Sequence, residues 1–306
     1  MAEYTLRQLE YFVAVAEAGS VTGAAAAVHL SQSAMSTALA DLERALDVQL
    51  LLRHHARGVT LTAAGEQLVV ASRQLLNQAG ELLSEAQGLG QELTGTLTLG
   101  CFSVLAPYVL PQIHGICAER YPELRLVTHE EDLDGLSDGV LSGRFELGLG
   151  YDLEPDNRLT IKPVFTLPPY ALVAGDHRLA RRKKVRLEQL ADEPLALLDL
   201  PKSRDYFLGL FTAAGVAPDV RYRTTSVETA RALVGLGLAY TLLNLRPKMS
   251  TSLDGHKVVP VALADDSSAL DVVMLTAASG RPTRRAAAVA ELCIEVLRRR
   301  APQAGK

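Results

Sequence analysis

Residues 5–46 read TLRQLEYFVAVAEAGSVTGAAAAVHLSQSAMSTALADLERAL, and this stretch decides the fold of the N-terminal part of the chain. Thr5 is followed three residues later by Gln8, which is the spacing of a capping box at the start of a helix. Apolar residues then recur at helical intervals. Ser20 and Ser31 are the expected N-cap residues of two more helices, the second reaching about residue 46. Three short helices in close succession predict a helix-turn-helix module.

The third helix has two contrasting faces. Its apolar stripe is spaced by four, three and four residues and consists of Met35, Leu39, Leu42 and Leu46. The opposite face is small and polar, and residues 31–40 carry no charge. An ordinary solvated face, the main alternative, usually carries Glu, Lys and Arg; a protein–protein face is a second alternative. Gln, Ser and Thr side chains pair with bases or phosphates, and a helix N-terminus binds a phosphate. The predicted DNA contacts on this helix are Ser31, Gln32, Ser33, Ser36 and Thr37.

A small hairpin, or wing, follows this helix. Apolar runs at residues 50–53 and 58–61 flank the turn HHAR. Arg53, His54 and Arg57 are the predicted phosphate or minor-groove contacts, although His54 is equally well read as a plain surface residue. Residues 1–61 contain four basic and six acidic side chains, a net charge of −2. Because phosphate neutralisation supplies much of DNA affinity, we expect tight binding only by an oligomer, with a modest salt dependence.

A long helix with a heptad seam comes next. Thr62 caps this helix, which we expect to reach about residue 90. The seam positions alternate in steps of four and three and are Leu68, Ser72, Leu75, Ala79, Leu82, Ala86, Leu89 and Leu93. The seam predicts pairing with the same helix of a second chain; packing on the C-terminal part of the chain is the alternative.

After Gly95, short apolar strands alternate with helices to the end of the chain. This alternation predicts an α/β domain with a mostly parallel sheet and helices on both faces. The strands are too many for one compact sheet, so we expect two subdomains separated by a cleft. Ligands of such domains bind beyond the carboxyl ends of the strands.

Composition excludes several functions. The 306 residues fit two or three domains, and the net charge of −4 argues against a protein that coats nucleic acid indiscriminately. No apolar run is long enough to span a membrane and the N-terminus lacks a signal-peptide pattern, so we expect a cytoplasmic protein. Walker, GxSxG and HExxH motifs are absent, so we expect neither an enzyme nor a cofactor. A solute-binding or enzymatic α/β protein with a helical N-terminal interaction module is the alternative.

The three cysteines, Cys101, Cys117 and Cys293, match no zinc spacing and no CxxC motif. We therefore expect no metal site. Buried or incidental thiols are the expected interpretation, with a redox-sensing role for Cys101 as the alternative, because Cys101 follows a predicted strand near a possible pocket.

The chain resembles LysR-type transcriptional regulators over nearly its whole length. In the N-terminal part the resemblance is carried by residues 6–12, 16–20, 24–25, 31–32, 42–43 and 59–65. Further on it is carried by residues 143–148, 176–180 and 233–238. The sequence departs from the family pattern at Ser33, Thr37, Asp47, Leu51 and Asn244. The departures on the third helix indicate that it reads an unusual operator.

The resemblance implies three parts: a winged helix-turn-helix DNA-binding domain at 1–61, a linker and dimerisation helix at 62–93, and an effector-binding domain at 94–306. The last would have the two-subdomain periplasmic-binding-protein type 2 fold. Subdomain I would comprise residues 94–163 and 265–306, and subdomain II residues 164–264. The resemblance also implies a homodimer or homotetramer, an inverted-repeat operator in double-stranded DNA, and contact with RNA polymerase.

The resemblance further implies a switch in transcription when a small molecule enters the cleft. The corresponding effector-binding positions are Phe102, Ser103, Val104, Thr128, Ser203, Arg204 and Thr225. Arg204 would bind a carboxylate bidentately, and serine hydroxyls at helix N-termini suit an anion, so we expect an anionic effector. Simple N-capping is the alternative for Ser103 and Ser203, and plain surface exposure is the alternative for Arg204.

Overall fold

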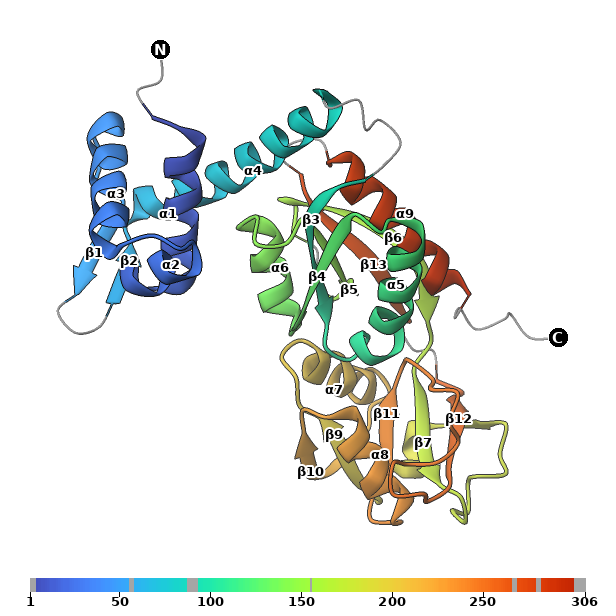
Figure 1. The fold of residues 1–306 in the computed structure, drawn as a ribbon. Helices are drawn as coiled ribbons and strands as arrows, with labels where there is room; N and C mark the ends of the chain where they lie inside the picture. Colours follow the sequence, from blue (N-terminus) through green and yellow to red (C-terminus); the bar gives the residue numbers. More distant parts are fainter. Residues whose placement is uncertain are drawn as a thin grey trace. The chain divides into compact units, whose positions relative to one another are not determined.

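The computed structural model describes residues 4–54, 58–86, 93–154, 156–265, 269–278 and 282–299. The chain divides into two compact units (Figure 1). The first extends to Gly95 and includes residues 141–144 and 283–285; the second contains the remainder. No helix in the described ranges is long and apolar enough to cross a membrane.

The N-terminal unit is a helix-turn-helix followed by a hairpin and a long helix. Its elements are α1 (Leu6–Ala18), α2 (Val21–Ala27), α3 (Gln32–Leu46), β1 (Leu51–His54), β2 (Gly58–Leu61) and α4 (Ala63–Ala86). The predicted capping box is confirmed, because the Gln8 amide donates to the Thr5 hydroxyl at 3.2 Å and the Thr5 amide donates to Gln8 Oε1 at 2.8 Å. Ser20 and Ser31 likewise cap α2 and α3, as predicted.

The core of this unit joins all three short helices to α4. Phe12 of α1 and Met35, Leu39 and Leu42 of α3 are fully or almost fully buried in one cluster with Val69 of α4. The predicted stripe on α3 is therefore confirmed, except that its last residue, Leu46, is only partly buried.

The hairpin is fixed against the end of α1. The Val59 amide donates to the Gly19 carbonyl oxygen at 2.8 Å, so the two segments approach closely. Gly58 has a φ of +84°, and a Cβ at this position would collide with the Gly19 carbonyl oxygen. Only glycine fits this conformation and this approach without strain.

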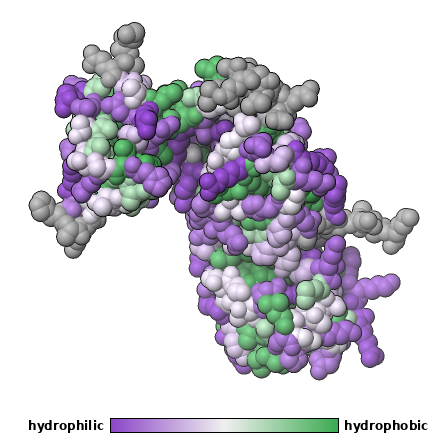
Figure 2. Space-filling model, viewed as in Figure 1, coloured by the Kyte–Doolittle hydropathy of each residue, from purple (hydrophilic) through white to green (hydrophobic). Residues whose placement is uncertain are grey.

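The seam predicted on α4 is divided between two environments. Leu68 packs against the core of the N-terminal unit and Ser72 is buried. Further along, Leu75 and Leu82 have 39% and 68% of their surface exposed. Figure 2 shows hydrophobic surface along this helix. The predicted helix end near residue 90, and with it Leu89, lies outside the described residues.

The C-terminal unit contains two groups of strands, which we call subdomains I and II. Subdomain I has a five-stranded sheet in the order β4 (Leu124–Glu131), β3 (Gly95–Phe102), β5 (Leu147–Tyr151), β13 (Leu270–Ala277) and β6 (Leu159–Leu167). Its helices are α5 (Ala106–Arg120), α6 (Leu133–Leu141) and α9 (Arg284–Arg298). Figure 1 shows α6 on one side of this sheet and α5 and α9 on the other.

Subdomain II has a four-stranded and a two-stranded sheet. The first is ordered β11 (Thr241–Leu243), β7 (Tyr170–Ala174), β12 (Val258–Leu263) and β8 (Lys184–Val185), and the second pairs β10 (Asp219–Thr224) with β9 (Pro194–Leu198). The helices are α7 (Ser203–Ala213), α8 (Val227–Gly235) and the short 3-10 helix η1 (Leu187–Leu190).

The prediction of a mostly parallel sheet is wrong. Strands β3 and β5 are parallel, but β13 runs antiparallel to both β5 and β6. In subdomain II, β7 is antiparallel to both of its neighbours. Strand β6 has no counterpart among the predicted strands. Pro163 lies in its middle, and proline cannot donate to a β-ladder. It forms here because β6 is an edge strand that pairs only with β13, with a register shift beside Pro163.

Candidate functional site

The C-terminal unit contains a cavity where the two subdomains meet. Its empty volume is about 380 Å³, including the open solvent at its mouth. The residues that line it are Phe102, Val104, Tyr108, Tyr151, Leu198, Ser203, Tyr206, Phe207, Val227, Leu243, Asn244, Leu245 and Leu270. Phe102, Tyr151 and Leu198 are the last residues of β3, β5 and β9. The cavity therefore lies at the carboxyl ends of these strands, where the sequence predicts a ligand-binding site.

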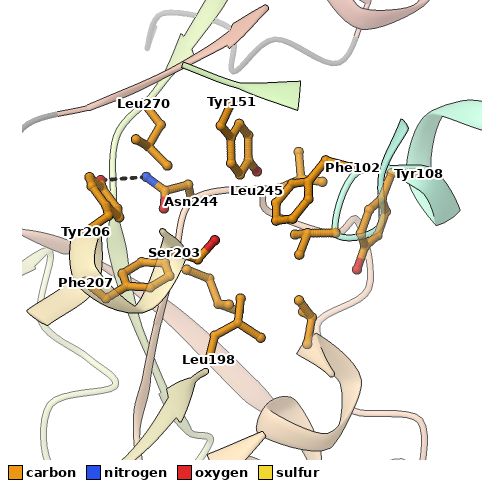
Figure 3. A pocket seen from close by; sticks show the side chains of 13 residues that line it. Phe102, Tyr108, Tyr151, Leu198, Ser203, Tyr206, Phe207, Asn244, Leu245 and Leu270 are labelled. Carbon is orange, nitrogen blue, oxygen red and sulfur yellow. Dashed lines mark hydrogen bonds between the residues drawn. The ribbon is translucent and has the colours of Figure 1, made fainter. Parts of the chain in front are cut away.

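Aromatic side chains enter the cavity from both subdomains (Figure 3). Phe102 and Tyr151 of subdomain I contact each other edge to face, with ring centroids 5.4 Å apart. Tyr206 and Phe207 of α7 form a second such pair, with centroids 5.0 Å apart. Among the lining residues none is charged. The cavity is therefore an apolar, aromatic site with a few polar groups, which is typical of small-molecule pockets.

Two of the polar atoms in this wall are buried without a hydrogen-bond partner among the described residues. They are the Tyr151 hydroxyl and Asn244 Oδ1. The other end of the Asn244 amide is fixed, because Nδ2 donates to the Leu167 carbonyl oxygen at 3.1 Å and to the Tyr206 hydroxyl at 3.0 Å. Burial raises the pKa of Tyr151 far above its ordinary value, so this residue stays neutral. Figure 3 shows the Ser203 hydroxyl directed into the space between the aromatic pairs.

Three of the seven predicted effector-binding residues line this cavity: Phe102, Val104 and Ser203. Ser203 is the first residue of α7, whereas the N-cap position is held by Lys202. Simple N-capping therefore does not account for Ser203.

The other four predicted residues do not line the cavity. Thr128 lies on β4, where its hydroxyl is 3.0 Å from His114 Nε2, and Thr225 is exposed before α8. Ser103 is half-buried, and its amide donates to the Glu131 carbonyl oxygen at 2.8 Å.

Arg204 is held by acidic neighbours outside the cavity lining. Its guanidinium contacts Asp205 at 3.1 Å and Asp199 at 3.4 Å, and 42% of its side chain is exposed. These contacts raise its pKa, chiefly through the hydrogen bond to Asp205. The guanidinium already has two carboxylate partners, so the structure gives no support to its predicted role as a carboxylate receptor.

Polar contacts also join the two subdomains beside the cavity. Lys202 of subdomain II lies 2.8 Å from Asp134 and 3.3 Å from Glu154, both in subdomain I. Its backbone has a φ of +62°, a rare conformation for a non-glycine residue. In addition, the Tyr108 hydroxyl of α5 donates to Glu228 of α8 at 3.2 Å.

Sequence reasoning missed ten of the lining residues, including Tyr151, Tyr206 and Asn244. A signal was present for some of them. Tyr151 ends an otherwise aliphatic strand, and Asn244 follows the apolar strand β11 where the family pattern often has proline.

The predicted DNA-reading face on α3 is exposed. Ser31, Gln32, Ser33 and Thr37 are exposed and Ser36 is half-buried. Some of their hydroxyls bond within the helix: Ser31 accepts from the Ala34 amide at 3.1 Å, and Thr37 donates to the Ser33 carbonyl oxygen at 3.0 Å. Gln32 has the longest polar side chain among the predicted contacts on this face.

The hairpin residues are described in part. Arg53 is exposed on β1, and His54 Nε2 lies 2.8 Å from the Thr60 hydroxyl across the hairpin. Arg57 lies outside the described residues.

Two acidic residues of this unit are held by internal partners. Glu43 accepts hydrogen bonds from the Leu50 and Leu51 amides at 2.8 and 3.1 Å. Glu17 contacts Arg73 of α4 at 3.1 Å. Part of the negative charge of this unit, which opposes DNA binding, is thus engaged in contacts that hold the unit together.

All three cysteines are buried and free. Burial raises the pKa of each thiol; for Cys293 it reaches about 12, and Cys101 is raised further, with Cys293 as a second cause. Peroxide and disulfides react with the thiolate, so these thiols lack the property of a redox sensor. The redox alternative for Cys101 therefore has no support in its surroundings. Among the described residues no group of His, Cys, Asp or Glu could hold a metal ion.

Comparisons with known proteins match both units. Residues 6–66 match the family described as bacterial regulatory helix-turn-helix protein, lysR family, and residues 90–298 match the LysR substrate binding domain. The chain is 34% identical to a "Hydrogen peroxide-inducible genes activator" of Pectobacterium carotovorum subsp. carotovorum, an alignment that covers 78% of this chain and 79% of that protein. It is 33% identical to the "DNA-binding transcriptional dual regulator OxyR" of Escherichia coli K12, covering 78% of each chain.

A solved structure is also similar over nearly the full length. HinK, a LysR family transcriptional regulator from Pseudomonas aeruginosa, is 33% identical with a TM-score of 0.65. The similarity covers 96% of this chain and 98% of HinK.

Proposed function

The chain belongs to the LysR family of bacterial transcriptional regulators, and we propose that it reads its operator with the outer face of α3 and with the β1–β2 hairpin. It is a DNA-binding regulator and not an enzyme. The observation that carries the proposal is the outer face of the first turns of α3, where residues 32–40 carry no charge and Gln32 is the first, exposed residue. A glutamine in a major groove can bond adenine through both ends of its amide.

The proposal includes an oligomer. Leu75 and Leu82 are large apolar side chains exposed on one long helix, and the seam spacing places them on the same side. Two α4 helices would cover them in a homodimer, and two dimers would form a homotetramer. The operator would then be an inverted repeat, since a twofold protein matches a twofold site.

In the same proposal, a small molecule in the cavity changes transcription. The cavity lies where the subdomains meet, so its occupant would contact both and favour one arrangement of them over another. RNA polymerase is the expected further partner, and genomic DNA as a target places the protein in the cytoplasm.

Peroxide is not the proposed signal. Several relatives are named for hydrogen peroxide, but the three thiols of this chain are buried and have raised pKa values. We expect treatment with hydrogen peroxide to leave the footprint on DNA unchanged. A footprint that shifts with peroxide and recovers with a reductant would contradict this assignment.

DNase footprinting of the intact protein on the DNA upstream of its own gene tests the regulator proposal. The expected result is a protected region with dyad symmetry that weakens when Gln32 is replaced by alanine. A protein that binds solutes only would give no protection. Protection that is identical for the wild type and for Gln32→Ala would exclude Gln32 as a reading contact.

A further inference from the structure

We propose that the ligand of the cavity is a neutral small molecule built on one aromatic ring and carrying a hydrogen-bond donor. This inference rests on the proposed function of the cavity as the effector site. It differs from the anionic effector that the family resemblance led us to expect.

The electrostatics of the wall favour a neutral ligand. The lining contains no charged side chain. The two cations that flank Ser203 in the chain are engaged elsewhere, since Lys202 and Arg204 each contact two carboxylates. An ion in this cavity would lose its hydration without gaining a partner, which is costly.

The helix N-termini at the cavity do not favour an anion either. The Ser203 and Arg204 amides at the start of α7 already donate to the Pro201 and Leu200 carbonyl oxygens, at 2.6 and 2.9 Å. The first turn of α7 contains an acidic residue, and so does that of α8. Carboxylates in the first turn offset the positive end of the helix dipole, which would otherwise attract an anion.

The aromatic lining favours a ring. Phe102 and Tyr151 stand on the subdomain I side, and Tyr206 and Phe207 on the subdomain II side. A flat ring between them would form offset or edge-to-face contacts with both pairs. One ring is enough to contact both pairs, so we expect a ligand with a single ring and a short substituent.

The orphaned polar atoms indicate the substituent. Asn244 Oδ1 can only accept a hydrogen bond, whereas the Tyr151 hydroxyl can donate or accept. Both residues are more than nine-tenths buried. A buried polar atom without a partner carries a desolvation penalty that a suitable ligand would remove. A primary amide or an alcohol supplies both a donor and an acceptor.

Titration calorimetry on the intact protein with four probes tests the ligand class. Benzamide and benzoate have nearly the same shape and differ in charge, and so do benzyl alcohol and benzylammonium. We expect each neutral probe to bind at least about tenfold more tightly than its charged counterpart, the ratio expected from the loss of one good interaction. Tighter binding of either ion would overturn the proposal, and so would the absence of binding by both neutral probes at millimolar concentration.

Two matched variants locate the binding site. Tyr151→Phe removes the orphaned hydroxyl in the cavity. Tyr240→Phe removes another buried hydroxyl that has no partner among the described residues, from a side chain that does not line the cavity. We expect both variants to be at least as stable as the wild type in urea unfolding. Tyr151→Phe should weaken benzamide binding about tenfold, and Tyr240→Phe should leave it unchanged.

The outcome separates failure of the ligand class from failure of the proposed function. If Tyr151→Phe and Tyr240→Phe bind benzamide equally to the wild type, the assignment of the Tyr151 hydroxyl is wrong. If benzoate is the tighter ligand and shifts the DNase footprint, the effector function of the protein stands and the neutral class is wrong. If the free protein protects no DNA, the regulator proposal itself fails, whichever probe binds.

Discussion

The outer face of α3 and the cavity of the C-terminal unit both present hydrogen-bonding groups to a partner, but in opposite surroundings. Gln32 and Ser33 are exposed, so a base or phosphate would replace solvent at these groups. The Tyr151 hydroxyl and Asn244 Oδ1 are buried and have no partner in the part of the chain that the structure describes. A contact that replaces water contributes little free energy, whereas one that satisfies an orphaned buried atom also removes a penalty. The α3 face therefore depends on several copies acting together, while the cavity can depend on single contacts.

The largest effect is expected when the chains of the oligomer are separated, so that each α3 face must bind DNA alone. Leu82→Glu places a charge on the exposed part of the α4 seam, where 68% of the leucine is accessible, so the fold of one chain is left intact. We expect the oligomer to dissociate and operator affinity to fall at least about 100-fold, because linked binding modules gain on the order of 10²–10⁴ in affinity. Sedimentation velocity and gel shift measure the two effects.

Leu253→Glu is the matched control, since Leu253 is 74% exposed in the C-terminal unit and lies outside the seam. It should change neither the assembly nor the operator affinity. A monomeric Leu82→Glu protein that binds the operator as tightly as the wild type would show that one α3 helix suffices.

The second test concerns a single contact on α3. Gln32→Ala should reduce operator affinity about tenfold, because one bidentate side chain–base pair is worth about 1–3 kcal/mol. The side chain is exposed, so urea unfolding should not change. Ser31→Ala is the contrasting variant: it removes the α3 N-cap, and should lower the free energy of unfolding by about 1 kcal/mol.

Affinity measured on randomised operator fragments distinguishes a contact to a base from a contact to the DNA backbone. Gln32→Ala should relax the preference at one base pair in each half-site. An equal loss on every sequence would mean that Gln32 contacts the backbone of the DNA instead.

The two regions also differ in how far their residues could be predicted. The α3 face follows from local signals, since Ser31 caps the helix and the apolar stripe fixes which side faces outward. The cavity is formed by segments that are distant in sequence, and Tyr151, Tyr206 and Asn244 meet only once both subdomains have folded. No local spacing encodes such a meeting, so the lining residues that were predicted, Phe102, Val104 and Ser203, came from the family resemblance.

Two of the errors have physical causes that the sequence shows only in part. Strand β6 contains Pro163, which is unfavourable in an interior strand, and its edge position depends on pairing with β13 more than 100 residues later. Arg204 was assigned to an anion because the chain gives no measure of its surroundings. Asp205 is its neighbour in sequence, but Asp199 comes close only through the turn that follows β9.

The smallest expected effect concerns the contacts across the cavity. Lys202→Met removes the ion pairs to Asp134 and Glu154 but keeps a Cβ at the unusual backbone conformation, so the strain is unchanged. Both carboxylates are more than half exposed, so these pairs stabilise the arrangement in which they join the two subdomains, here called the closed state, by about 0.5–1 kcal/mol. We expect benzamide affinity to fall by up to about threefold, because the apparent affinity follows the fraction of the free protein in the closed state.

Salt provides the sharper readout for this contact. A neutral ligand has no charge to screen, so any dependence of benzamide affinity on salt must arise within the protein. Wild-type affinity should decline with salt towards the Lys202→Met value, whereas the variant should show little change, because salt screens partly exposed ion pairs. Arg221→Met removes an exposed ion pair to Asp219 within subdomain II and should behave like the wild type. If the affinity of Lys202→Met varies with salt as steeply as that of the wild type, then the ion pairs of Lys202 do not hold the cavity closed.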